Sequence, residues 1–180
     1  MTAYALVHFP DIDRTRINEL RDEYDPYRDL IDVHITVVFP LPADEQALSE
    51  HIESVLRRWS PFTIRLTGLV LSFDQWLFLT VREGEDRITR LFEDLYTGLL
   101  APHRRHDIDY VPHVGLGYFG TQEYDPSDPT AVPLDEARYG EALQKAETAN
   151  LDYQCVLDRL SLVERDDQFS QVVPVREFVL

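Results

Sequence analysis

Two stretches of the chain carry apolar residues at the spacing of an amphipathic helix. Over about Asp44–Trp59 the apolar positions recur three or four residues apart, and Pro61 ends the pattern. The same spacing runs through about Glu85–Leu100. Two weaker patterns predict further helices, one from Asp11 or Asp13 to about Asp25 and one over Leu134–Ala149.

Runs of β-branched and aromatic residues predict the strands between these helices. The predicted strands are Tyr4–Phe9, Val33–Phe39, Phe62–Leu71, Gln75–Val81, Val111–Phe119, Leu151–Val163 and Phe169–Leu180. Polar or proline-rich composition predicts irregular structure over Ala101–Tyr110 and Thr121–Pro133, and a turn at Asp166-Asp167.

The order of these elements repeats along the chain. A strand that contains His34 is followed by a helix and two strands, and a strand that contains His113 is followed by a loop, a helix and two strands. Duplication of this kind predicts two similar lobes whose matching positions face each other. We therefore expect one α+β domain over residues 1–180, with lobes at about 1–84 and 85–180 and with exchange of strands between them left open.

The two histidine strands align residue by residue. Val33-His34-Ile35-Thr36-Val37-Val38-Phe39 and Pro112-His113-Val114-Gly115-Leu116-Gly117-Tyr118 each place a β-branched residue after the histidine and an aromatic residue five positions after it. Because side chains alternate along a strand, His34 and Thr36 share one face, as do His113 and Gly115. Two imidazoles near neutral pKa can remove one proton and donate another without a metal, and a threonine hydroxyl can bind a phosphate oxygen.

These paired segments resemble the His-x-Thr/Ser motifs of the 2H phosphoesterase superfamily, which includes 2′,5′ RNA ligase and 2′,3′-cyclic nucleotide phosphodiesterase proteins. The resemblance covers nearly the whole chain. It implies a bilobal fold with a central cleft, and metal-independent hydrolysis of a 2′,3′-cyclic phosphate or a 2′,5′ phosphodiester in a nucleotide or RNA end. It implies His34 and His113 as the acid/base pair and Thr36 as a phosphate donor. Which histidine is the base stays open.

Gly115 departs from the family pattern, because glycine has no hydroxyl where the family has Thr or Ser. Loss of one such donor costs about 10²–10³-fold in rate unless a backbone N–H or a nearby side chain replaces it. Three hypotheses follow. The chain is an enzyme of this type, a nucleotide or RNA-end binding protein without turnover, or an interaction module that keeps only the fold.

The charge of the chain limits the kinds of partner that it can bind. Asp and Glu number 33 against 17 Lys and Arg, which gives a net charge of −16. A polyphosphate backbone is repelled by such a chain, so we expect a nucleotide or RNA terminus rather than an extended nucleic-acid surface. The single cysteine excludes an internal disulfide, and no apolar run is long enough to span a bilayer. We expect a cytoplasmic monomer without a cofactor or membrane contact.

Several other residues have two possible roles, one functional and one structural. Tyr118 is equally placed to stack on a base or to pack in the core. Arg82 and Arg176 are candidates for neutralising the phosphate, but the sequence does not select either. A metal at His103 and His106 is disfavoured because no further ligand stands near them. We expect His8 to be packed or exposed, His51 and Cys155 to be structural, and the Arg104-Arg105 pair to lie in a solvated loop.

Overall fold

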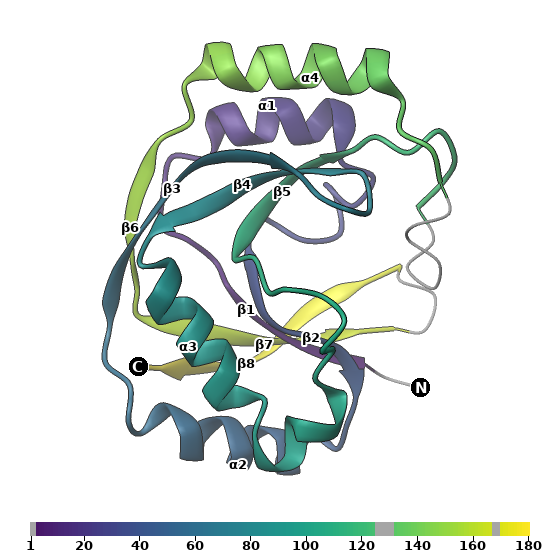
Figure 1. Cartoon of the computed structure of the whole chain (residues 1–180). Helices are drawn as coiled ribbons and strands as arrows, with labels where there is room; N and C mark the ends of the chain where they lie inside the picture. The colour runs from purple at the N-terminus through teal and green to yellow at the C-terminus, as the bar shows by residue number, and fades with distance from the viewer. Residues whose placement is uncertain (1–2, 125–131, 167–169) are drawn as a thin grey trace.

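The computed structural model describes residues 3–124, 132–166 and 170–180. Within these residues the chain forms an α+β fold of two four-stranded antiparallel sheets, as expected from the sequence (Figure 1). Sheet A has the order β2 (Ile35–Pro42), β1 (Ala3–His8), β7 (Arg159–Arg165), β8 (Val172–Val179). Sheet B has the order β5 (His113–Tyr118), β4 (Trp76–Glu83), β3 (Phe62–Leu71), β6 (Tyr153–Leu157).

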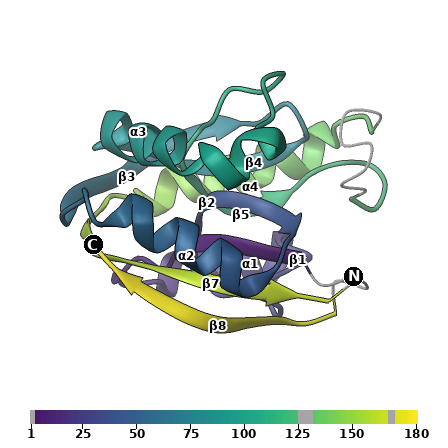
Figure 2. The same cartoon turned by 90° about the horizontal axis from the view of Figure 1, so that it is seen from below.

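The helices are exchanged between the two halves of the fold. They are α1 (Thr15–Tyr24), α2 (Glu45–Leu56), α3 (Glu85–Leu95) and α4 (Glu136–Ala149), with a 3₁₀ helix at Gly98–His103. Helix α1 connects β1 to β2 of sheet A but packs with α4 against sheet B, whereas α3 connects two strands of sheet B but packs with α2 beside sheet A (Figures 1 and 2). Each sheet also takes strands from both sides of residue 84.

The two histidine segments occupy equivalent positions. Strand β2 is an edge of sheet A, and β5 is an edge of sheet B. Each pairs with the strand before it in the chain, β2 with β1 and β5 with β4, and a helix connects the two strands of each pair. The two edges lie next to each other in the molecule. The repeat in the sequence is therefore also present in the topology.

Each sheet has one face in the main core and one face that carries a histidine. On β4, Leu77, Leu79 and Val81 are buried in the main core. The opposite face of sheet B carries Trp76, Phe78 and Thr80 on β4 with His113, Gly115 and Tyr118 on β5, and we call it the histidine face of sheet B. The corresponding face of sheet A carries Ala5 and Val7 on β1, with His34 and Thr36, and is called the histidine face of sheet A.

Several predicted boundaries were wrong. Leu151–Val163 is not one strand but two, β6 and β7, which lie in different sheets and are separated at Asp158. The helix predicted to reach Leu100 ends at Leu95, before Gly98 adopts a positive φ of 49°. Three parts of the prediction lie outside the described residues: residues 125–131 of the loop, Asp167 of the turn, and Phe169 at the start of the last strand.

The predicted start of the second helix is confirmed. Asp44 caps α2 by accepting a hydrogen bond from the Ala47 N–H at 2.9 Å. An aspartate at this position satisfies a backbone donor that would otherwise have no partner in the first turn. Asp135 caps α4 in the same way.

Candidate active site

His34 lies directly before β2, one residue outside the strand that was predicted to contain it. It is half-buried, and its Nδ1 lies 2.8 Å from the carbonyl oxygen of Asp32. A carbonyl only accepts hydrogen bonds, so Nδ1 carries the proton of the neutral ring. The other ring nitrogen, Nε2, is then left with a free lone pair.

His113 repeats this arrangement at the start of β5. Its Nδ1 lies 2.6 Å from the carbonyl oxygen of Val111, again two residues earlier in the chain. The same argument assigns the proton to Nδ1 and the lone pair to Nε2. The ring is also stacked on Phe78 of β4, with centroids 3.4 Å apart and planes inclined by 16°. The imidazole is therefore fixed by a backbone acceptor on its edge and an aromatic ring on its face.

Burial makes both imidazoles weaker bases than a free histidine. The pKa of His113 is lowered to about 4, mainly by burial and to a smaller degree by the nearby His34, while the Val111 carbonyl acts in the opposite direction. Burial also lowers the pKa of His34, against the opposing effect of the Asp32 carbonyl. Both lowered pKa values favour the neutral imidazoles at pH 7.

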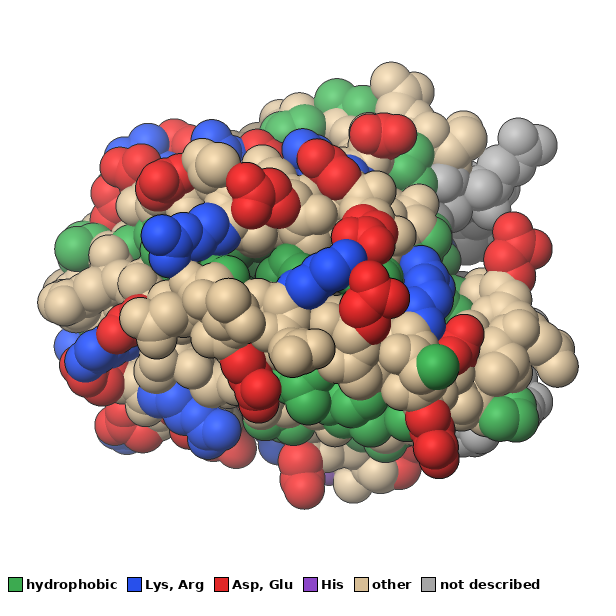
Figure 3. Space-filling model, turned by 90° about the horizontal axis from the view of Figure 1, so that it is seen from above, with side chains coloured by type: hydrophobic (Ala, Val, Ile, Leu, Met, Phe, Trp, Pro, Cys, Tyr) green, Lys and Arg blue, Asp and Glu red, His purple; other side chains and the backbone are tan. Residues whose placement is uncertain are grey.

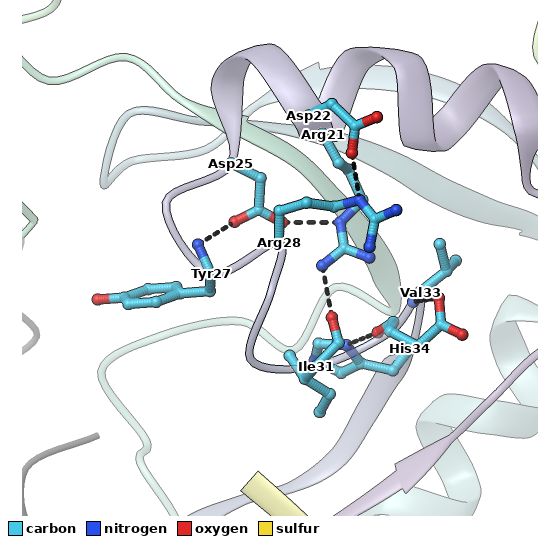
Figure 4. Close-up of polar contacts among 9 residues, drawn as sticks. Arg21, Asp22, Asp25, Tyr27, Arg28, Ile31, Val33 and His34 are labelled. Carbon is cyan, nitrogen blue, oxygen red and sulfur yellow. Dashed lines mark hydrogen bonds and ion pairs between the residues drawn. The ribbon is translucent and has the colours of Figure 1, made fainter. Parts of the chain in front are cut away.

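The segment before His34 is held by a buried ion pair (Figure 4). The Arg21 guanidinium on α1 lies 2.7 Å from the Asp25 carboxylate, and both side chains are at most 5% exposed. The same guanidinium donates a hydrogen bond of 2.8 Å to the carbonyl of Ile31, three residues before His34. Asp25 also accepts from the Tyr27 N–H at 2.8 Å. One arginine thus connects both ends of the loop that positions His34.

Replacement of Arg21 tests this role. We expect Arg21→Met to lower the free energy of unfolding by about 3–5 kcal/mol, because it leaves the Asp25 carboxylate buried without its partner. Arg28→Met is the matched control, since Arg28 pairs with a 62% exposed Asp22 on the same segment and is expected to cost about 1 kcal/mol or less. Urea unfolding of both variants measures the difference. Equal losses would show that the Arg21 pair has no special role.

Thr36 lies on the same face of sheet A as His34, as predicted from strand alternation, and is half-buried. No described residue contacts its hydroxyl by a hydrogen bond. Its carbonyl accepts a hydrogen bond of 2.9 Å from the Tyr110 hydroxyl. Tyr110 precedes His113 by three residues, so this bond connects the second histidine segment to the first.

Sequence reasoning did not identify Tyr110, Phe78 or Arg21 as residues of the site. Tyr110 stands in a polar stretch, and only its proximity to His113 in the chain was a usable signal. Phe78 reads as an ordinary strand aromatic. Arg21 and Asp25 are four residues apart on a predicted helix, a spacing that normally indicates an exposed pair.

Gly115 lies on the histidine face of sheet B, two residues after His113. A Cβ atom at this position would lie 3.6 Å from Cε3 and 3.7 Å from Cζ3 of Trp76, which is ordinary van der Waals contact. The position therefore has room for a small side chain. The backbone φ of Gly115 is not in the left-handed region, so nothing in the local conformation requires glycine.

Tyr118 is buried in an aromatic cluster beside Gly115, formed by Tyr27, Trp76, Tyr118 and Tyr124. Tyr27 stacks on Trp76 with centroids 6.0 Å apart, and Tyr118 lies 5.6 Å from Trp76. Tyr27 and Tyr124 are half-buried and form the outer part of the cluster. Burial raises the pKa of Tyr27, and the Arg165 guanidinium of β7 opposes that rise, so the cluster also approaches sheet A.

The remaining candidates lie in structural surroundings. His8 is buried and its Nδ1 contacts the Arg159 carbonyl at 2.9 Å, while His51 Nε2 contacts the Leu95 carbonyl at 2.8 Å. Cys155 is buried, and burial raises the pKa of its thiol to about 11. Arg104 pairs with Glu93 at 3.6 Å, and Arg105 pairs with Asp107. Throughout the described residues, no group of three or more His, Cys, Asp or Glu side chains is arranged to hold a metal ion.

The two arginine candidates differ in position. Arg176 on β8 forms an ion pair with Glu53 of α2, on the side of sheet A where the helices pack. Arg82 on β4 lies two residues after Thr80, and its side chain extends over Gly68 on the histidine face of sheet B. Only Arg82 therefore belongs to the surroundings of His113.

The molecular surface over α4 and α1 gives no support for a duplex-binding site on that side. Asp and Glu side chains are interspersed there with Lys and Arg (Figure 3). A duplex contact requires a run of cations along a phosphate backbone. None of the helices in the described part of the chain has the length and hydropathy needed to cross a membrane.

The comparisons with known sequences agree on one protein family. The model of the 2′-5′ RNA ligase superfamily matches residues 9–169. A protein of Bacillus cytotoxicus, named provisionally as a phosphoesterase, is 26% identical over 166 residues, which cover 88% of this chain and 86% of that protein. A similarly named protein of Geobacillus kaustophilus is 30% identical over 123 residues, covering 63% of this chain and 68% of that protein.

Comparison with solved structures gives the same fold. E. coli LigT in complex with 3′-AMP aligns with a TM-score of 0.60 at 17% identity, covering 99% of this chain and 97% of that one. E. coli LigT in complex with ATP aligns with a TM-score of 0.57 at 16% identity, covering 99% and 96%. At these identities the likeness concerns the fold.

Proposed function

The chain belongs to the 2′-5′ RNA ligase superfamily, and we propose that it is a phosphoesterase that hydrolyses a 2′,3′-cyclic phosphate or a 2′,5′ phosphodiester in a nucleotide or at an RNA end. The relatives named as phosphoesterases and the nucleotide in the LigT complex support the coarser part of this proposal. The finer part depends on the two histidines.

One observation carries the proposal: the same histidine geometry occurs twice, on two neighbouring sheet edges. Each Nδ1 is bound to the carbonyl two residues earlier, at 2.8 Å for His34 and 2.6 Å for His113. A proton-transferring histidine needs an Nε2 that is free to contact the substrate, and this arrangement leaves Nε2 free in both. Duplication of this detail supports a matched acid and base.

For a cyclic phosphate the proposed reaction has two proton transfers. Nε2 of one neutral histidine takes a proton from the attacking water, whose oxygen forms a bond to phosphorus. The bond from phosphorus to the 2′ or 3′ oxygen breaks, and that oxygen takes a proton from Nε2–H of the other histidine, which is protonated. The product is a phosphomonoester. The two histidines end in exchanged protonation states, and exchange with solvent restores them.

Thr36 is proposed to stabilise the charge that develops on a non-bridging phosphate oxygen. Its hydroxyl has no partner among the described residues and shares a face with His34. A hydroxyl already fixed near the phosphate needs no reorganisation as charge builds on the non-bridging oxygen. We propose that the half-buried rings of the aromatic cluster, with Tyr118 beneath them, hold the base.

The direct test is hydrolysis of 2′,3′-cyclic nucleotides and of a short RNA with a cyclic phosphate end, with EDTA present. Chromatography of the products identifies which P–O bond is broken. Turnover that persists in EDTA supports chemistry by the chain's own residues. Absence of turnover on every cyclic and 2′,5′-linked substrate would overturn the proposed activity.

A second candidate function is favoured by Gly115. Without the second hydroxyl, the same site is suited to bind a nucleotide or RNA end and release it unchanged. Calorimetric binding of a 2′- or 3′-nucleotide, without turnover of the cyclic form, would indicate this function. An interaction module that keeps only the fold would show neither.

The pH dependence follows from the lowered pKa values. We expect a bell-shaped profile of kcat/KM, because one histidine must be protonated and the other neutral. Burial lowers the pKa of both, that of His113 to about 4, so the singly protonated pair is populated only on the acidic side of the ordinary histidine pKa. Therefore kcat/KM falls as the pH rises towards 7.

The profile of kcat is expected to differ from that of kcat/KM. A bound phosphodiester is an anion and stabilises the imidazolium, so it raises the pKa of the pair in the complex. The fall in kcat should therefore occur at higher pH than the fall in kcat/KM. A rate that rises with pH to a plateau would contradict paired acid/base catalysis.

A further inference from the structure

Gly68 is a glycine within a strand of sheet B, and a side chain of β4 occupies the space beside it. A Cβ atom on Gly68 would collide with Nε of Arg82 and with Oγ1 of Thr80, and would lie 2.8 Å from Cζ of Arg82. Glycine inside a strand often marks a close approach by another group. Here that group is the Arg82 side chain, which lies flat across β3.

Arg82 is on the same face of the sheet as His113. The strand register pairs Gly68 with Thr80, and Thr80 with His113, which places the three residues in one row across β3, β4 and β5. Neighbouring strands are about 4.8 Å apart, so the Arg82 guanidinium lies roughly 10 Å from His113 along this row. Thr80 between them is buried, and its hydroxyl donates to the Gly68 carbonyl at 3.2 Å.

The charge of Arg82 is not neutralised by the protein. Arg82 is exposed, and no carboxylate of the described residues pairs with it. Many other arginines of this acidic chain do form ion pairs, namely Arg14, Arg21, Arg28, Arg65, Arg104, Arg105, Arg159 and Arg176. The adjacent Glu83 pairs with Arg65 at 2.9 Å rather than with Arg82. The guanidinium fork of Arg82 is therefore available to an anion.

We propose that Arg82 binds a second phosphate of the substrate, separate from the phosphate that reacts at His34 and His113. The inference depends on the proposed function, because it takes the reacting phosphate to lie between the histidines. A gap of roughly 10 Å between the Arg82 guanidinium and His113 leaves room for each group to contact one phosphate of a nucleotide that is phosphorylated at its 5′ oxygen and at its 2′,3′ oxygens. The preferred substrate is then a 5′-phosphorylated nucleotide or an RNA end, rather than a nucleoside cyclic monophosphate.

The test compares two substrates that differ by one phosphate. These are a nucleoside 2′,3′-cyclic monophosphate and the same compound with an added 5′-phosphate. We expect the wild type to have a kcat/KM at least tenfold higher for the second, the size of one charge-assisted hydrogen bond. Arg82→Gln is expected to remove this preference, so that its kcat/KM is about equal for the two substrates.

Arg58→Gln is the matched control. Arg58 is exposed just after α2, a helix that contacts β8 at the opposite edge of sheet A from β2, and its loss changes the net charge by the same amount. It should keep the full preference for the 5′-phosphate, which separates a local contact from a general effect of charge. An equal preference in wild type and Arg82→Gln, or none in the wild type, would overturn the inference and identify Arg82 as a solvated arginine.

Binding measurements separate this inference from the proposed activity. Calorimetry with a nucleoside 3′-monophosphate and a nucleoside 3′,5′-bisphosphate requires no turnover. If the wild type binds the bisphosphate about tenfold more tightly and Arg82→Gln does not, the second phosphate site stands even for a protein without phosphodiesterase activity. If Arg82→Gln binds both ligands as the wild type does, the site is refuted whatever the activity.

Discussion

Alanine in place of His34 or of His113 is expected to lower turnover of a 2′,3′-cyclic nucleotide by about 10²–10⁴-fold, the contribution of one general acid or base. Each substitution removes the Nε2 to which the proposed mechanism assigns one of the two proton transfers. Turnover by the double variant should be little lower than turnover by the slower single variant, because the effects of substituting two groups that act in one step are not additive. Initial rates at the pH optimum of the wild type measure these losses.

His106→Ala is the control for both variants. His106 is exposed on the polar stretch after the 3₁₀ helix, and its replacement is expected to leave turnover unchanged. Thermal unfolding should be followed in parallel, since both reactive histidines are half-buried. If a folded His34→Ala or His113→Ala keeps near wild-type turnover, the paired mechanism is wrong.

The same two variants can assign the acid and the base. A phosphodiester with a p-nitrophenol leaving group needs little protonation of the departing oxygen. Loss of the general acid should therefore cost much less with this substrate than with a cyclic nucleotide, whereas loss of the base should cost the same with both. The matched geometry of His34 and His113 gives no reason to prefer either assignment, so the substrate comparison is needed.

The order of elements was predictable because most of them carry a clear hydrophobic period. Two examples are the helix Glu45–Leu56 and the strand Phe62–Leu71. Each buries one face in the core, so the buried residues recur with the period of a helix or of a strand. The division at Asp158 was not predictable, because the chain passes from β6 to β7 without glycine or proline. The exchange of α1 and α3 between the sheets also leaves no local signal, since either sheet offers the same kind of surface.

The histidines of the candidate site were predictable, but their supports were not. His34 and His113 were found because the same short pattern occurs twice in equivalent surroundings. Arg21 escaped notice because periodicity does not distinguish an exposed ion pair from one that the fold covers. The sequence alone did not favour Arg82 over other arginines. Its position near His113 follows from the strand register, which places Gly68, Thr80 and His113 in one row.

Gly115→Ser is expected to raise kcat by about 10²-fold, the lower end of what one phosphate donor contributes. Its Cβ would lie 3.6 Å from Trp76, so the side chain enters without displacing the aromatic cluster. Its hydroxyl would stand two residues after His113, as Thr36 stands two residues after His34. Serine is the better choice than threonine, because the extra methyl group would crowd the Trp76 ring.

Gly115→Ala isolates the hydroxyl, because it adds the same Cβ without a donor. We expect its kcat to stay close to that of the wild type, so the ratio between the serine and alanine variants measures the donor alone. Equal rates for the serine and alanine variants would mean that another group already donates to the phosphate oxygen. The wild type would then lack no phosphate donor because of Gly115. If the wild type binds nucleotides without turnover and only the serine variant turns them over, then the absence of one hydroxyl separates a binding protein from an enzyme on this fold.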